Sequence, residues 1–144
     1  MKRTPLRKVS DRGRLIKEAE KLLRQILKDK RGNKCEVCGR KPADLGLAHI
    51  LPKGKYPSLR LYPENILLLC WMPCHYFWHH DRDDARAKRV EAKIIKKLGA
   101  DWLDTLRVKA KLMPRLTEFQ ICLYIYAFKQ ETKEVVTAYE NRPK

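Results

Sequence analysis

The sequence lacks any apolar run of the ~18 residues that a membrane-spanning helix needs. No apolar signal core follows its basic N-terminal residues, and it contains neither an internal repeat nor a low-complexity tract. These absences exclude the membrane-spanning and repeat classes of protein, and they argue against secretion. We therefore expect a cytoplasmic protein with no membrane partner.

Acidic residues are scarce, with 17 Asp and Glu against 33 Lys and Arg, which gives a formal net charge of +16. The imbalance is uneven, because residues 1–34 carry 13 basic and 4 acidic side chains whereas residues 35–81 carry 5 and 4. Such a basic protein is expected to meet a polyanion, and nucleic acid is the first candidate. The alternative is that the basic residues are only solvated helix faces, but their concentration near the N-terminus favours a partner.

The length of 144 residues fits one compact domain preceded by a short arm. We expect an α+β fold that is mostly helical. Residues 1–9 are predicted to be a flexible basic arm. Residues 10–144 would form the domain, with an N-terminal helix in 10–33, a small core with strands in 34–81 and a helical extension in 82–144.

The N-terminal helix has clear start and stop signals. Ser10 or Asp11 can cap its first free N–H groups, and Gly32-Asn33 is a natural stop. Apolar residues recur between these limits with the 3.6-residue period of a helix that packs one face on a core. They are Leu15, Ile16, Ala19, Leu22, Leu23, Ile26 and Leu27.

The rest of the chain is predicted to contain two short strands, at residues 45–51 and 66–69, and a helix that begins at Pro73. Thr117 and Gln120 fit a capping box, which favours a helix over residues 118–134. Its run 121–128 is apolar all round and is also compatible with a buried strand. A helix there would bury a second face in this core or against a second copy, so a homodimer is expected through this segment.

Four cysteines fall into two close pairs, Cys35 with Cys38 and Cys70 with Cys74. In an intracellular chain such pairs indicate metal binding rather than disulfides. Four thiolates complete a tetrahedral Zn²⁺ site and leave no position open, so this metal would be structural. The second pair has three intervening residues where two are usual. The alternative is four reduced, partly buried thiols, and the fifth cysteine, Cys122, is interpreted as a small core residue.

The histidines suggest a second site beside the cysteines. His75 and His79 are four residues apart, so a helix would place both imidazoles on one face where they can bind one cation. His49 ends the first predicted strand, and a neutral imidazole there can act as a general base. Asn65 begins the second strand, where its amide can hold the His49 loop or serve as a plain turn residue.

These residues match a family in their order along the chain. Cys-x2-Cys, Ala-His-Ile-Leu-Pro, Pro-Glu-Asn-Ile-Leu-Leu-Leu-Cys and Cys-His-x3-His resemble the motifs of HNH endonucleases over residues 35–80. The resemblance implies a zinc-stapled ββα-metal core, flanked here by N-terminal and C-terminal α-helices. His49, Asn65 and His75 would then be the catalytic H, N and H.

The resemblance also implies a mechanism of DNA phosphodiester hydrolysis. His49 would take a proton from the attacking water, while a divalent ion on His75 and His79 would stabilise the phosphate and the leaving 3′ oxygen. That ion would be Mg²⁺ or Mn²⁺, with Zn²⁺ or Ni²⁺ as alternatives. Many members place Asp or His before the first motif histidine as a further ligand, whereas this chain has Ala48. Asp81, Asp83 and Asp84 are candidates for a missing oxygen ligand.

A looser resemblance in the flanking segments suggests the substrate. A basic helix before the first cysteine pair, and Lys-Ile-Ile-Lys-Lys-Leu-Gly-Ala-Asp-Trp-Leu-Asp after the motif, are similar to NinG/Rap recombination nucleases of lambdoid phages. That likeness implies branched DNA as partner and a bacterial or phage-infected cell as location. Lys53, Lys55 and Arg60, in the loop between the strands, are candidate phosphate contacts. The competing hypotheses are a zinc-stapled nucleic-acid-binding module without catalysis and a basic assembly protein.

Overall fold

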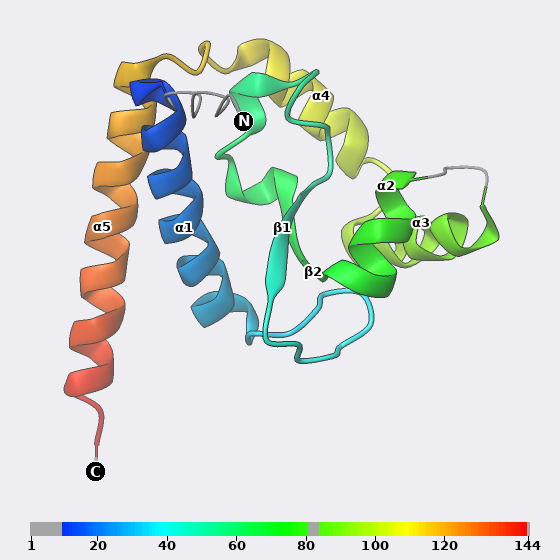
Figure 1. Ribbon diagram of the computed structural model, residues 1–144, viewed down its shortest axis with the longest axis horizontal. Helices are drawn as coiled ribbons and strands as arrows, with labels where there is room; N and C mark the ends of the chain where they lie inside the picture. The colour runs from blue at the N-terminus through cyan, green and yellow to red at the C-terminus, as the bar shows by residue number, and fades with distance from the viewer. Residues whose placement is uncertain (1–9, 81–83, 144) are drawn as a thin grey trace, which may run out of the picture.

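The computed structural model describes residues 10–80 and 84–143, so the predicted basic arm at 1–9 lies outside the described residues. The described chain is a mixed α and β structure that is mostly helical, with five helices and one two-stranded sheet. Figure 1 shows the sheet in the middle, with α1 and α5 on one side of it and α2 and α3 on the other. The predicted fold class is therefore confirmed at this level, as α+β with helices before and after the strands.

Helices α1 (Asp11–Arg31) and α5 (Glu118–Glu140) lie side by side and begin at the same end of the molecule (Figure 1). The Ser10 hydroxyl caps α1 by accepting the Gly13 N–H, and Gly32 ends it in the left-handed conformation at φ 87°. The Arg12 guanidinium donates to the Leu116 carbonyl at 2.8 Å, which ties the two helix starts together. The predicted apolar stripe of α1 is buried as expected.

The apolar run at 121–128 is helical rather than a strand. Thr117 caps α5 by accepting the Gln120 N–H at 3.2 Å, as the capping box predicted. One face of the run is buried through Ile121, Ile125 and Phe128, while Phe119, Leu123 and Tyr126 remain exposed. The exposed face is where a second copy was expected to pack, and that association stays a prediction. The interpretation of Cys122 as a core residue is wrong, because its side chain is exposed.

The sheet pairs β1 (Leu45–His49) with β2 (Ile66–Cys70) in antiparallel register, with Leu45 opposite Cys70 and His49 opposite Ile66. Every residue of β2 is buried. β1 ends two residues before the predicted limit at residue 51. The backbone N–H groups of Ile50 and Leu51 turn instead to the main-chain and side-chain oxygens of Asn65, both at 2.8 Å.

Short helical segments follow each strand. The loop after β1 contains two short helical turns, η1 (Pro57–Leu59) and η2 (Pro63–Asn65). After β2 the chain forms a wide helical turn, η3 (Trp71–His75), which continues into α2 (Tyr76–His80). Two longer helices follow, α3 (Ala85–Leu98) and α4 (Trp102–Leu112). The helix expected from Pro73 is confirmed, because the extended backbone at φ −124° and ψ 128° belongs to Met72, and the helical residues from Pro73 continue through α2 to His80. No helix in residues 10–80 and 84–143 is long and apolar enough to cross a membrane.

One buried carboxylate joins three of these segments. Glu36 lies between the first two cysteines with only 6 % of its side chain exposed. It accepts the Leu68 N–H of β2, the Arg31 guanidinium at the end of α1 at 3.1 Å, and the Lys97 ammonium of α3 at 3.1 Å. Because two cations and a backbone donor surround it, the negative charge is compensated although it is buried.

Removing this charge should destabilise the fold. We expect Glu36→Gln to lower the free energy of unfolding by about 2–3 kcal/mol, since hydrogen bonds to charged groups contribute about 1.5–3 kcal/mol. Its matched control is Glu131→Gln, which breaks the exposed ion pair with Lys30 and should cost about 0–1 kcal/mol. Urea unfolding of the two variants measures the difference, and equal losses would contradict the role given to Glu36.

Candidate metal centre and histidine site

Cys35, Cys38, Cys70 and Cys74 come together at one end of the sheet. Their four sulfurs all lie within 4.8 Å of one another, and Cys38 Sγ is 3.7 Å from Cys70 Sγ. A tetrahedral zinc site with Zn–S bonds of ~2.3 Å has sulfur–sulfur edges of about 3.8 Å. None of the four is in a disulfide. The predicted donor set therefore forms a site that is able to bind a metal such as zinc.

Local structure explains how each pair reaches the site. In the first pair, the Cys35 N–H donates to the Arg40 carbonyl and the Gly39 N–H donates to the Cys35 carbonyl, which closes a tight knuckle. Gly39 stands at φ 74°, in the left-handed region that favours glycine. In the second pair, Cys70 ends β2 and Cys74 lies in η3. The extended backbone at Met72 accommodates the third intervening residue of this pair.

The thiol pKa values differ within the cluster. Burial raises the pKa of Cys35, but backbone N–H donors from Cys38, Cys70 and Val37 outweigh it and bring the value down to about 7. Burial, together with the nearby charge of Cys35, raises the pKa of Cys74. Such crowded sulfurs cannot all ionise without a cation among them, which is the condition that a divalent metal meets.

His49 stands at the end of β1 and is 8 % exposed. Its Nε2 is 2.8 Å from the Arg60 carbonyl oxygen, which can only accept, so Nε2 carries the hydrogen. The neutral ring therefore keeps its lone pair on Nδ1. Burial lowers the pKa of His49 below its ordinary value of 6.5, and the Lys53 ammonium adds to this effect. Both features suit a base at neutral pH.

Asn65 is completely buried and holds the loop that follows His49. Its Oδ1 accepts the Leu51 N–H at 2.8 Å, and its Nδ2 donates to the carbonyls of Leu51 at 3.1 Å and Leu59 at 3.3 Å. The prediction that the Asn65 amide holds this loop by hydrogen bonds is confirmed. The alternative, in which Asn65 is only a turn residue, is excluded. A buried amide with all these groups paired fixes the chain on both sides of His49.

His75 and His79 lie next to each other across the η3–α2 junction, with ring centroids 5.0 Å apart. Burial lowers the pKa of His75, and Lys53 lowers it further. The same Lys53 charge acts on His49, so both histidines lie within its electrostatic reach. Among the described residues, three or more His, Cys, Asp or Glu gather with metal-binding geometry only in the cysteine cluster. The histidine pair thus brings together two candidate ligands.

The remaining predicted positions differ in burial and in their contacts. Ala48 is fully buried beside His49 and pairs with Leu67, so it offers no ligand. Lys53 and Lys55 are exposed, whereas Arg60 is engaged in a partly buried ion pair with Glu20 at 2.8 Å. Asp84 caps α3 by accepting the Arg86 N–H. Asp81 and Asp83 lie outside the described residues.

Three contributors to the histidine site escaped the sequence reasoning. A side chain at Gly46 would place its Cβ 3.1 Å from His75 Nδ1, so glycine lets the imidazole pack on β1. The Arg60 carbonyl orients His49, and a main-chain group leaves no sequence signal. Trp78 stacks on His79 with ring centroids 4.9 Å apart. The sequence signal for a contribution from Trp78 was its position three residues after His75 on the predicted helix.

Comparisons of this chain with protein-family models, with curated proteins and with solved structures find no match.

The cysteine cluster should carry one zinc ion per chain and depend on it for stability. We expect Cys38→Ser to lose the metal and several kcal/mol of folding free energy, because binding free energy at structural zinc sites of about 10–16 kcal/mol is coupled to folding. The control is Cys122→Ser, since this exposed cysteine lies outside the cluster. Elemental analysis and thermal unfolding check both variants, and a metal-free wild-type protein with unchanged stability would contradict the prediction.

Proposed function

We propose that the protein is a metal-dependent DNA endonuclease of the HNH type that hydrolyses phosphodiester bonds. The observation that carries the proposal is the state of His49, whose Nε2–H is held by the Arg60 carbonyl so that Nδ1 is left as a base. The β1–β2–α2 order around His49, Asn65 and His75 supports it further.

The chemistry assigned to the residues follows from their positions. His49 Nδ1 accepts a proton from a water molecule that attacks the scissile phosphate, and its lowered pKa keeps it neutral for that task at pH 7. Asn65 holds the loop so that the imidazole keeps its orientation. His75 and His79 would hold a divalent cation, which when bound supplies Lewis-acid stabilisation of the phosphate charge. Lys53 adds positive charge beside both histidines.

The choice of DNA as substrate rests on charge and on the looser family resemblance. The net charge of +16 favours a polyanion, and phosphate contacts from Lys53, Lys55 and the basic face of α1 would supply affinity without reading sequence. The likeness to recombination nucleases favours branched DNA. A cleavage assay that compares Holliday junctions, flaps, linear duplex and RNA, with and without Mg²⁺ or Mn²⁺, tests this choice.

The second candidate is a zinc-stapled nucleic-acid-binding module without catalysis. It is favoured by Ala48, because the buried methyl group leaves the histidine pair without the third protein ligand that many HNH members have. This candidate predicts salt-sensitive binding of nucleic acid with neither cleavage nor a second metal site. Calorimetric titration of the zinc-loaded protein with Mn²⁺, in the presence of DNA, separates the two candidates.

Replacing the general base His49 should strongly reduce DNA cleavage without unfolding the protein. We expect His49→Ala to reduce DNA cleavage by about 10²–10⁴-fold, the usual contribution of a general base. Because His49 does not belong to the cation pair, the variant should still respond to Mn²⁺ in the titration, whereas His75→Ala should lose that response. Cys122→Ser serves as the active control. Equal cleavage by wild type and His49→Ala would refute the assignment.

Cleavage should also depend on pH in one direction. His49 works as a base only when neutral, and burial moves its pKa below 6.5. The single-turnover rate at saturating Mn²⁺ should therefore be level around neutral pH and fall only below the ordinary histidine pKa, as the ring becomes protonated. A rate that already falls between about pH 8 and pH 7 would show that a group of higher pKa controls the reaction.

A further inference from the structure

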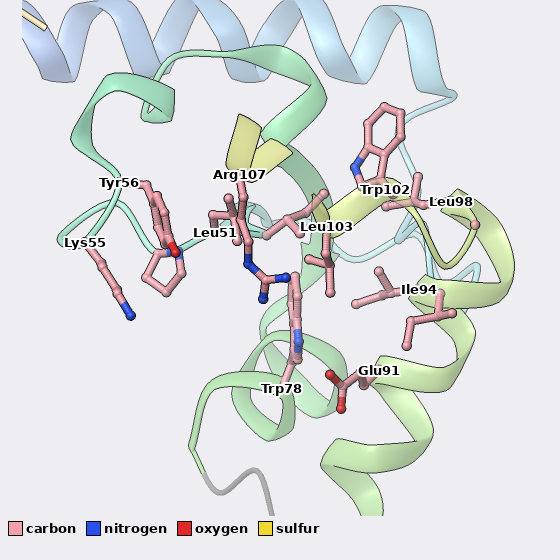
Figure 2. Close-up of a pocket in the computed structure, with 14 residues that line it drawn as sticks. Leu51, Lys55, Tyr56, Trp78, Glu91, Ile94, Leu98, Trp102, Leu103 and Arg107 are labelled. Carbon is pink, nitrogen blue, oxygen red and sulfur yellow. The ribbon is translucent and has the colours of Figure 1, made fainter. Parts of the chain in front are cut away.

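A cavity of about 210 Å³ lies next to the segment that follows His49 and next to Trp78, the residue before His79. It is formed by the loop that follows His49, by Trp78 of α2 and by residues of α3 and α4, as Figure 2 shows. This volume far exceeds the ~10–15 Å³ that one water needs and falls below the ~300 Å³ at which pockets for drug-sized ligands begin. The cavity therefore suits a single planar ring system.

The walls of the cavity are aliphatic and aromatic, with charged groups among them. Tyr56, Trp78 and Trp102 line it, together with Lys55, Arg107 and Glu91. The Trp102 Nε1–H is buried and has no hydrogen-bond partner among the described residues. Figure 2 shows this nitrogen on the edge of the indole that is turned toward the other labelled residues. A buried donor without a partner is costly, so an acceptor on a ligand would satisfy it.

The cavity also shares residues with the proposed reaction centre. The indole of Trp78 lines it and at the same time stacks on His79 at 4.9 Å. Ile50 and Leu51 line it and directly follow His49, in the segment that Asn65 braces. A ligand whose ring occupied the cavity would therefore place the chemical group attached to that ring near the histidines and Lys53.

We propose that this cavity accepts one unstacked nucleobase of the DNA substrate, beside the phosphodiester that is cut. The inference rests on the proposed nuclease function. Proteins hold extruded bases by stacking on aromatic rings and by hydrogen bonds to the base edge, and here Trp102 supplies a donor and Glu91 an acceptor. Lys55 and Arg107 place positive charge where the backbone of that nucleotide would pass.

The proposal narrows the substrate class. Extruding a base from a paired duplex costs stacking and pairing energy, and the cost is least where the base is already unpaired. The cavity therefore selects DNA with an unpaired nucleotide at the cut site, such as a bulge, a flap or the centre of a branch. This selection needs no reading of sequence, because every base has a face that can stack.

The test is a binding experiment without added Mg²⁺ or Mn²⁺, so that it does not depend on cleavage. Three fluorescent duplexes are compared by anisotropy: fully paired, with one unpaired adenine, and with an abasic residue in place of that adenine. We expect the zinc-loaded protein to bind the adenine bulge about tenfold more tightly than the abasic bulge, which corresponds to the stacking of one base. Since both bulges bend the DNA, their difference isolates the base.

Variants then assign the effect to the cavity. Trp78→Ala should bind the adenine and abasic bulges equally, whereas Trp78→Phe, which keeps an aromatic ring, should retain most of the difference. Trp102→Phe removes only the buried N–H and should reduce the difference a few-fold. Phe119→Ala is the control, because this aromatic side chain on α5 is 68 % exposed and lies outside the cavity. Circular dichroism and zinc content verify that each variant is folded.

The outcomes separate this inference from the function on which it rests. Equal affinity of the folded wild type for the adenine and abasic bulges overturns the base pocket, whatever the cleavage assay gives. A difference that survives in folded Trp78→Ala also overturns it. A clear preference for the unpaired base in a protein that never cleaves DNA supports the pocket and removes the nuclease assignment.

Discussion

The four-sulfur cluster is the constraint on which the rest of the structure depends. It connects a knuckle after α1 to the end of β2 and to the turn before α2, both of which lie 32 or more residues further along the chain. The sheet has only two short strands, and a pair of strands alone is marginally stable in water. Bringing four partly ionised thiols within one small volume is favourable only around a cation. The cluster that is able to hold a metal therefore also fixes the position of His75, one residue after Cys74.

Two other sets of contacts fix the segments near the candidate histidines. Glu36, placed between two of the cysteines, extends the anchor to α1, β2 and α3 through charged hydrogen bonds. Asn65 acts at the opposite end of the sheet, where it closes the loop after His49 with three hydrogen bonds. His49 and His75 thus come from separate elements, with His49 held by its hydrogen bond to the Arg60 carbonyl and His75 packed against Gly46 of β1.

Much of this arrangement could be predicted from the sequence, because it depends on residues that are close together along the chain. The α1 stripe and its caps, the capping box of α5 and the cysteine spacing each follow from side chains a few residues apart. The brace at Asn65 could be anticipated because amides commonly fix loops beside a strand. Three features had no such signal. The contact of Gly46 with His75 depends on how a turn folds back on a strand, the Arg60 carbonyl is a main-chain group, and the exposed position of Cys122 depends on which face of α5 meets α1.

The cavity beside Trp78 belongs to this second kind of feature, since its walls come from a loop, α2, α3 and α4. Its location bears on how the proposed cation site, with only two imidazole ligands, would work. A cation held by two histidines binds weakly unless the substrate completes its coordination, and a phosphate does so only when its position is fixed. A nucleobase lodged against Trp78 would fix that position through the sugar that joins base and phosphate. Substrate binding would then complete the reaction centre in the same step. DNA that cannot place an unpaired base in the cavity would leave the cation weakly bound. The missing ligand at Ala48 would in that case contribute to substrate selectivity, because the reaction centre would be complete only on DNA that can place a base in the cavity.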